Sequence, residues 1–169
     1  IPGYSALVYL AGTETGRLIL ETIIDSGVTI DSNALNRMIE QGPNRGASAL
    51  FWLAATKTGR PVLEKIIDSG VTIGSKALNH IIEQGPNQET SALFWLSVTE
   101  TGCRVLEKIV DSGVTIDSKT LNYIIEQGPN RGQSALFYLA ETKTGRKILS
   151  KDLSSMIRMD WLKPDTIID

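Results

Sequence analysis

The stretch from residue 48 to residue 90, SALFWLAATKTGRPVLEKIIDSGVTIGSKALNHIIEQGPNQET, decides how this chain folds, because closely similar text precedes and follows it. Each copy opens on a serine, and the opening serines, Ser5, Ser48, Ser91 and Ser134, are spaced 43 residues apart. Repetition at a fixed period between about 20 and 50 residues is typical of solenoids and other repeat arrays. The sequence predicts one repeat domain over residues 1–169, with units 5–47, 48–90, 91–133 and 134–169.

Each full unit is predicted to contain three helices. Ser48 caps a first helix at about 49–56, whose residues are apolar nearly all round, as expected of a helix buried between neighbours. A second helix follows the turn at 58–59 and ends at Ser69-Gly70, with its apolar residues in one stripe. A third helix is expected at 75–84, before the Gly85-Pro86-Asn87 stop.

A unit of this size cannot bury its apolar stripes alone, so we expect the copies to stack in register. The predicted fold class is all-α, a right-handed α-solenoid of tandem three-helix repeats. The fourth unit leaves the pattern at about residue 150, which indicates a C-terminal cap or the lead into a further domain. Because the chain begins at Ile1-Pro2-Gly3 without an initiator methionine, we expect it to be a segment of a longer protein.

The text GRPVLEKIIDSGVTI, which follows SALFWLAA in residues 48–73, resembles an ankyrin repeat. Shared features are a capped first helix, a glycine turn, a second helix rich in Val, Leu and Ile, and Ser-Gly before an extended link. The chain departs from ankyrin in its period of 43 instead of about 33, in a longer first helix than that of TPLHLAA, and in the added segment SKALNHIIEQ.

Armadillo units also have three helices at about this length, although their motifs are not found here. The pattern is similar too to degenerate ankyrin-type arrays of large secreted effectors of intracellular bacteria. These resemblances imply a binding scaffold and supply no catalytic residues.

Composition excludes several classes of function. Lys and Arg number 17 against 19 Asp and Glu, for a formal charge of −2, which is unlike the basic footprint of a nucleic-acid binder. No stretch approaches the roughly 18 consecutive apolar residues of a membrane span. The single cysteine, Cys103, closes no internal disulfide and fits a reducing compartment. We therefore expect no nucleic acid, no membrane and a cytoplasmic location, which is the host cytosol if the chain belongs to a secreted effector.

Candidate chemistry is sparse. Units two and three share 31 of 43 positions, and copies of one module do not readily supply the unique arrangement that catalysis needs. Cys103 stands where other units have arginine, and the lone histidine His80 has no metal-ligand cluster around it. The paired carboxylates of the second helices, such as Glu64 and Asp68, are interpreted as a solvated charged face. A column of Asn36, Asn79 and Asn122 predicts an amide ladder that bonds to backbone between units. We expect no catalytic residues, no metal and no cofactor.

Exposed positions that change between near-copies are the natural candidates for recognition. On a third helix of full length, Arg37, His80 and Tyr123 would face away from the core and form a column of large side chains of the kind interfaces favour. A second column, on the outer side of the second helices, consists of Leu18, Pro61, Arg104 and Lys147. These seven residues are the predicted partner-binding residues. Neutral variation at unconstrained surface sites would give the same pattern.

The sequence thus predicts a non-catalytic protein–protein interaction scaffold, part of a larger bacterial effector or adaptor, with a protein partner of unknown identity. The alternative is a substrate-positioning or structural appendage of an enzyme whose catalytic domain lies outside this chain. The chain is expected to be a monomer or to associate weakly end to end, because Leu7, Val8, Tyr9 and Leu10 have no earlier unit to cover them.

Overall fold

A computed structural model describes residues 4–161 of the chain and the side chains of residues 4–152. Within that range the chain is all-α, and no strand is formed. The helices are α1 (Ala6–Gly12), α2 (Glu14–Asp25), α3 (Ser32–Asn36), α4 (Ala49–Ala55), α5 (Gly59–Asp68), α6 (Ser75–Asn79), α7 (Ala92–Ser97), α8 (Glu100–Asp111), α9 (Ser118–Leu121), α10 (Ala135–Glu141) and α11 (Lys143–Trp161).

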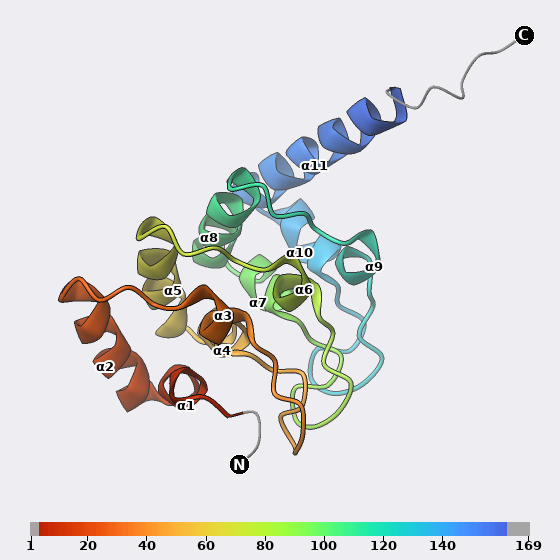
Figure 1. The fold of residues 1–169 in the computed structure, drawn as a ribbon. Helices are drawn as coiled ribbons and strands as arrows, with labels where there is room; N and C mark the ends of the chain where they lie inside the picture. The colour runs from red at the N-terminus through yellow and green to blue at the C-terminus, as the bar shows by residue number, and fades with distance from the viewer. Residues whose placement is uncertain (1–3, 162–169) are drawn as a thin grey trace, which may run out of the picture.

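Helices that occupy equivalent places in successive units pack side by side, which gives three rows (Figure 1). The first helices α1, α4, α7 and α10 form the middle row. The second helices α2, α5, α8 and α11 form a row on one side of it, and the short helices α3, α6 and α9 lie on the other. The middle row carries much of the core, since Leu50, Leu53, Leu93 and Leu96 are fully buried.

Serine and threonine side chains begin these helices as the sequence predicts. The hydroxyl groups of Ser5, Ser48, Ser91 and Ser134 each accept a hydrogen bond from the backbone N–H three residues later. Asp31 and Asp117 cap α3 and α9 by accepting from the backbone N–H two residues later, while Gly74 stands at that position before α6. Each cap satisfies a backbone donor that has no partner inside its helix.

The third helix is much shorter than predicted. We expected a helix over 75–84, but α6 ends at Asn79 and His80 already has extended backbone angles. The next residues form a hairpin instead, in which the Ile82 N–H donates to the Thr90 carbonyl at 2.9 Å and the Glu89 N–H to the Ile82 carbonyl at 2.7 Å. The same pair of bonds joins Ile39 to residues 46–47 and Ile125 to residues 132–133. Pairing with the following loop therefore overrides the helical pattern of SKALNHIIEQ.

The asparagine ladder is confirmed for Asn36 and Asn79, whereas among the described residues the Asn122 amide bonds only the Ser118 carbonyl of its own helix. The Asn36 side-chain amide donates to the Thr72 carbonyl at 2.9 Å and accepts from the Gly74 N–H at 2.7 Å, both in the next unit. Asn79 makes the equivalent bonds to the Thr115 carbonyl and the Asp117 N–H. Each amide thus ties the end of one third helix to the extended link of the following unit.

The carboxylates of the second helices are not simply a solvated face. Lys65 bonds Glu21 and Asp25 of the preceding unit, at 2.9 Å in each case. Lys108 bonds Glu64 and Asp68 in the same way, and Lys151 bonds Glu107 and Asp111. These ion pairs form a second ladder between units, on the side of the molecule away from the asparagines.

The fourth unit differs from the others because its second helix is longer. α11 continues to Trp161, past position 154, where the equivalent helix α8 has already ended at Asp111. The other units stop at a Ser-Gly pair with glycine at positive φ, such as Gly70 and Gly113, whereas Ser155-Met156 stands at this point in the fourth unit. None of the helices in the described part of the chain is long and apolar enough to cross a membrane.

Replacing Asn79 tests the amide ladder. Asn79→Ala leaves the Asp117 N–H without its partner and removes one of the two donors to the Thr115 carbonyl, which keeps the Ser75 hydroxyl at 3.2 Å, so we expect a loss of about 1–2 kcal/mol in the free energy of unfolding. Asn122→Ala is the matched control, because among the described residues the Asn122 amide bonds only Ser118 of its own helix. Urea denaturation of both variants gives the comparison, and equal losses would contradict a role for the ladder between units.

Candidate interaction surface

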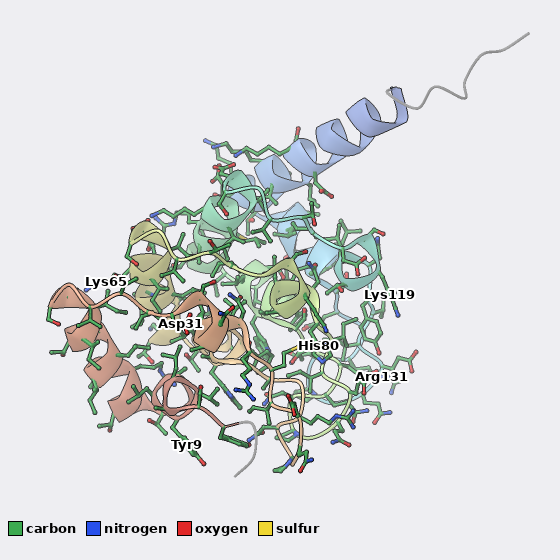
Figure 2. All side chains as sticks on the ribbon, viewed as in Figure 1. Tyr9, Asp31, Lys65, His80, Lys119 and Arg131 are labelled. Carbon is green, nitrogen blue, oxygen red and sulfur yellow. The ribbon has the colours of Figure 1, made fainter. Side chains whose placement is uncertain are left out.

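The molecule has two contrasting exposed sides. We call residues 37–47, 80–90 and 123–133 the hairpin face, and the solvent-exposed side of α2, α5, α8 and α11 the outer face. Figure 2 shows His80 and Arg131 on the hairpin side, and Lys65, which lies on the outer face, well away from them. The two columns of predicted binding residues fall on these two faces, one on each.

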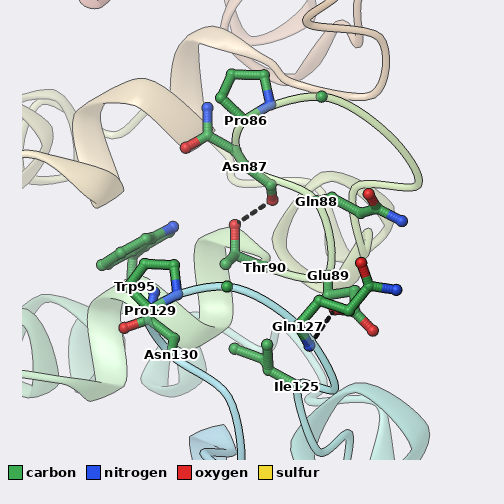
Figure 3. A pocket seen from close by; sticks show the side chains of 12 residues that line it. Pro86, Asn87, Gln88, Glu89, Thr90, Trp95, Ile125, Gln127, Pro129 and Asn130 are labelled. Carbon is green, nitrogen blue, oxygen red and sulfur yellow. Dashed lines mark hydrogen bonds between the residues drawn. The ribbon is translucent and has the colours of Figure 1, made fainter.

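The hollows found in the structure lie along the hairpin face. One of about 330 Å³ lies between the loops of units two and three, with Pro86 and Asn87 on one side, Pro129 on the other, and Trp95 as a wall (Figure 3). Others of about 440, 250 and 510 Å³ are lined mainly by the extended segments and hairpins of all three full units. Stacked hairpins therefore leave a row of open depressions along this face.

His80 lies between two of these hollows and lines both. Its half-buried ring covers Gly46 of the preceding hairpin, so that a Cβ added to Gly46 would come within 2.6 Å of Nε2. Burial lowers the pKa of His80 below its ordinary value of 6.5, and the nearby Glu83 carboxylate opposes that shift. The imidazole is thus mainly neutral at pH 7 and fills the space left by a missing side chain.

Tyr123 contacts the hairpin of its preceding unit in a different way. Its hydroxyl donates to Glu89 Oε1 at 3.0 Å, and the Gln127 N–H donates to Glu89 Oε2 at 3.0 Å (Figure 3 shows the second bond). Glu89 occupies the position of Gly46 and has a φ of 68°, a left-handed conformation that side-chain-bearing residues rarely adopt. Burial, followed by the Glu89 carboxylate, raises the pKa of Tyr123 and keeps the donor protonated. These bonds offset the strain at Glu89.

The structure brings His80 and Tyr123 together but not Arg37. His80 and Tyr123 line the same 440 Å³ hollow, whereas Arg37 is exposed one unit away and lines none of the four. The expectation that all three project from the outward side of a long third helix is wrong, because Arg37 and His80 are extended C-cap residues and Tyr123 follows the end of α9. Two of the three contact the preceding hairpin, whereas Arg37 belongs to the first unit of the given sequence, and none of the described residues forms a hairpin before it.

The second column lies on the outer face. Leu18, Pro61, Arg104 and Lys147 are all exposed there, which agrees with the pattern of the second helices. Lys147 is engaged in an ion pair with Glu107 at 2.7 Å, and this contact contributes to the lowered pKa of Glu107. No hollow described above involves these residues.

Cys103 is part of the core. Its thiol is fully buried, and its sulfur lies 3.5 Å from the Ser97 carbonyl and 3.5 Å from the Thr142 hydroxyl. The equivalent Arg17 and Arg146 reach the carbonyl at the same place in their own units, at Ala11 and Ala140. Burial raises the pKa of Cys103, so the thiolate that reactive cysteines need is disfavoured.

Sequence reasoning missed Glu89, the residue that distinguishes the second hairpin from the others. Its signal was present, because glycine stands at positions 46 and 132, and a side chain at a glycine position of a turn needs a compensating contact. Aligning position 89 with position 123 of the next unit would have identified its partner. Among the described residues, no group of three or more His, Cys, Asp or Glu side chains is placed to hold a metal ion.

The two hairpin contacts can be exchanged by mutation. Gly46→Glu alone should destabilise the chain by at least about 1–2 kcal/mol, because φ is 89° there and the new side chain meets His80. Adding His80→Tyr should recover at least about 0.5 kcal/mol of this loss by recreating the Glu89 to Tyr123 bond one unit earlier. A double-mutant cycle by urea denaturation measures the coupling, and strictly additive losses would refute it.

Burial of Cys103 predicts a protected thiol. In the folded chain it should react with Ellman's reagent at least about 100-fold more slowly than in denaturant, since reaction requires local opening. As a control, Arg104→Cys in a Cys103→Ser background places a thiol on the next, exposed residue of α8, and it should react quickly. Equal rates for the two thiols would show that Cys103 is accessible.

Comparisons of the chain with protein-family models, with curated proteins and with solved structures give no significant match. Its function has to be argued from its residues and their geometry.

Proposed function

We propose that this chain is a non-catalytic protein–protein interaction scaffold that binds its partner on the hairpin face. The observation that carries the proposal is the row of depressions between successive hairpins, four of which measure about 250 to 510 Å³. Mixed apolar, charged and amide side chains line them, as is usual at protein interfaces. Exposed residues beside them include Arg37, Arg131 and Ile124, the last with 61% of its surface accessible.

The wider architecture that we propose is a right-handed α-solenoid with ankyrin-like stacking. Contacts between equivalent helices of successive units support it, as does the hairpin at the end of each full unit. The resemblance of residues 48–73 to ankyrin-type arrays is the basis for proposing a segment of a larger bacterial effector or adaptor. A cytoplasmic location belongs to the same proposal, and the single unpaired cysteine supports it.

A non-catalytic role is the simplest account of the candidate groups. The Cys103 thiol is buried with a raised pKa, and the His80 ring covers a glycine. Near-identical units repeat the remaining polar groups, and these bond to one another between units. The groups best placed for chemistry are therefore occupied by structural contacts.

A pair of matched double variants tests the binding face. Arg37→Ala with Ile124→Asp alters the hairpin face, and Arg104→Ala with Leu18→Asp makes the same chemical changes on the outer face, where Leu18 is 60% exposed and Ile124 is 61% exposed. Used as baits in a eukaryotic lysate, the parent and the outer-face variant should retain the same protein, and the hairpin-face variant should lose it. All three baits are first shown to be folded by circular dichroism.

Two results would overturn the proposal. Loss of the retained protein only in the outer-face variant would move the binding site to the second helices. Recovery of nothing specific by any folded bait would favour the appendage of an enzyme whose catalytic domain lies elsewhere.

A further inference from the structure

Comparing positions 43 residues apart reveals an uncovered apolar surface at the C-terminal end of the array. Phe137 is 52% exposed, whereas Phe51 and Phe94, its equivalents in the preceding units, are 2% and 4% exposed. Ala140 is likewise exposed, although Ala11 and Ala54 are fully buried at the same position. These side chains face the next unit wherever a next unit exists. We call this surface the C-terminal end face.

The N-terminal end exposes the side chains that, in the later units, pack against the preceding unit. Ile19 is 47% exposed, but its equivalents Val62, Val105 and Ile148 are 2%, 0% and 0% exposed. Tyr9 is 52% exposed and points away from the body in Figure 2. The expectation for this end is corrected in part, because Leu7 and Val8 are buried, which leaves Tyr9, Ile19 and the partly exposed Leu10 uncovered. We call this surface the N-terminal end face.

Contacts inside the chain show how these two halves fit. Phe94 of unit three meets Tyr138 of unit four edge-on, with ring centroids 5.8 Å apart and planes at 74°. Phe137 and Tyr9 are the same pair of positions shifted by one unit, and each of them is half exposed. The apolar contact between the first helices of successive units therefore exists within the chain, and its two halves recur separately at the two ends. The third helix and hairpin that complete the contact between the full units have no counterpart among the described residues of the fourth unit, where α11 continues.

A hydrogen bond between two units of the chain also has its donor and its acceptor exposed separately at the two ends. Arg17 donates through Nε to the Thr58 hydroxyl of the next unit at 2.7 Å. Arg146, which is equivalent to Arg17, is exposed and bonds the Ala140 carbonyl of its own unit. Thr15, which is equivalent to Thr58, is exposed at the N-terminal end. Arg146 and Thr15 are thus a donor and an acceptor that would meet if one end stacked on the other.

The ion-pair ladder places no unmatched charge between the two ends. Thr22 stands at the position of Lys65, Lys108 and Lys151, so the first unit has no cation to present to a preceding unit. Ser150 stands at the position of Glu21, Glu64 and Glu107, so the fourth unit does not present that carboxylate to a following unit. Stacking these ends together buries neither a lone lysine nor a lone glutamate, and a buried lone charge would oppose association.

We propose that the N-terminal end face of a second copy of this chain stacks on the C-terminal end face, in the register that joins successive units. The second copy supplies the apolar side chains that the first and second helices of units two to four present to the unit before them, without the lysine that those units also supply. α11 runs out from the body in Figure 1, which leaves its first turns open to α2 of the second copy. Because the two faces differ, the contact is heterologous, and head-to-tail growth beyond a dimer follows.

Sedimentation velocity over a range of concentrations tests the stacking. The parent chain should increase in mass with concentration, and Phe137→Glu or Ile19→Glu should raise the dissociation constant at least about tenfold. Leu18→Glu is the control, because Leu18 lies next to Ile19 on α2 but belongs to a column that is exposed in all four units. Phe137 and Ile19 lie at the exposed ends, so circular dichroism should show both variants to be folded.

Mixing the two end variants separates head-to-tail stacking from other arrangements. Phe137→Glu keeps a native N-terminal end face, and Ile19→Glu keeps a native C-terminal end face. Each alone should remain a monomer, and an equimolar mixture should form a dimer that grows no further. A parent chain that stays monomeric up to about 1 mM would overturn the proposal. So would a mixture that fails to dimerise, or an end variant that still dimerises by itself.

Discussion

Each unit of this protein can bury its apolar helices only against a neighbouring unit, and the rest of the structure depends on that constraint. Leu53, Leu96 and Leu139 are fully buried because a preceding first helix lies against each of them, whereas Leu10, which has no unit before it, is partly exposed. Among the described residues, buried side chains of successive first helices therefore pack against one another from unit to unit. Stability is gained at the contacts between units, so changes at those contacts should affect it most.

Two polar ladders flank these first helices and have different roles. The lysine ladder joins side chains that are each more than a third exposed in most of its pairs, and exposed ion pairs contribute little to stability. The asparagine ladder satisfies backbone groups of the next unit, and leaving such groups without partners is more costly. We infer that Asn36 and Asn79 add to stability, while Lys65 and Lys108 mainly fix the register of stacking.

The sequence predicts the features that follow from local pattern and period, and fails where a segment pairs with residues outside that pattern. The serine caps, the buried first helix and the asparagine ladder follow from local pattern and period. The third helix does not, because Ile82 bonds backbone groups of Thr90 and Glu89 that helical periodicity alone cannot take into account. The lysine ladder is not predicted, because the carboxylates of one second helix, taken alone, have the pattern of a solvated charged face. Reading Lys65 against Glu21 and Asp25 of the unit before would have found it.

Variation between copies is a weaker sign of recognition than it appears from sequence, because neighbouring units change together. Position 46 is glycine where the next unit supplies His80, and position 89 is glutamate where the next unit supplies Tyr123. Both differences are explained by contacts inside the molecule and need no ligand. Arg37 has no preceding hairpin to contact, and Ile124 is largely exposed at the end of the row. Residues that vary without an internal partner are therefore the better candidates for binding, and on the hairpin face they lie at its two ends.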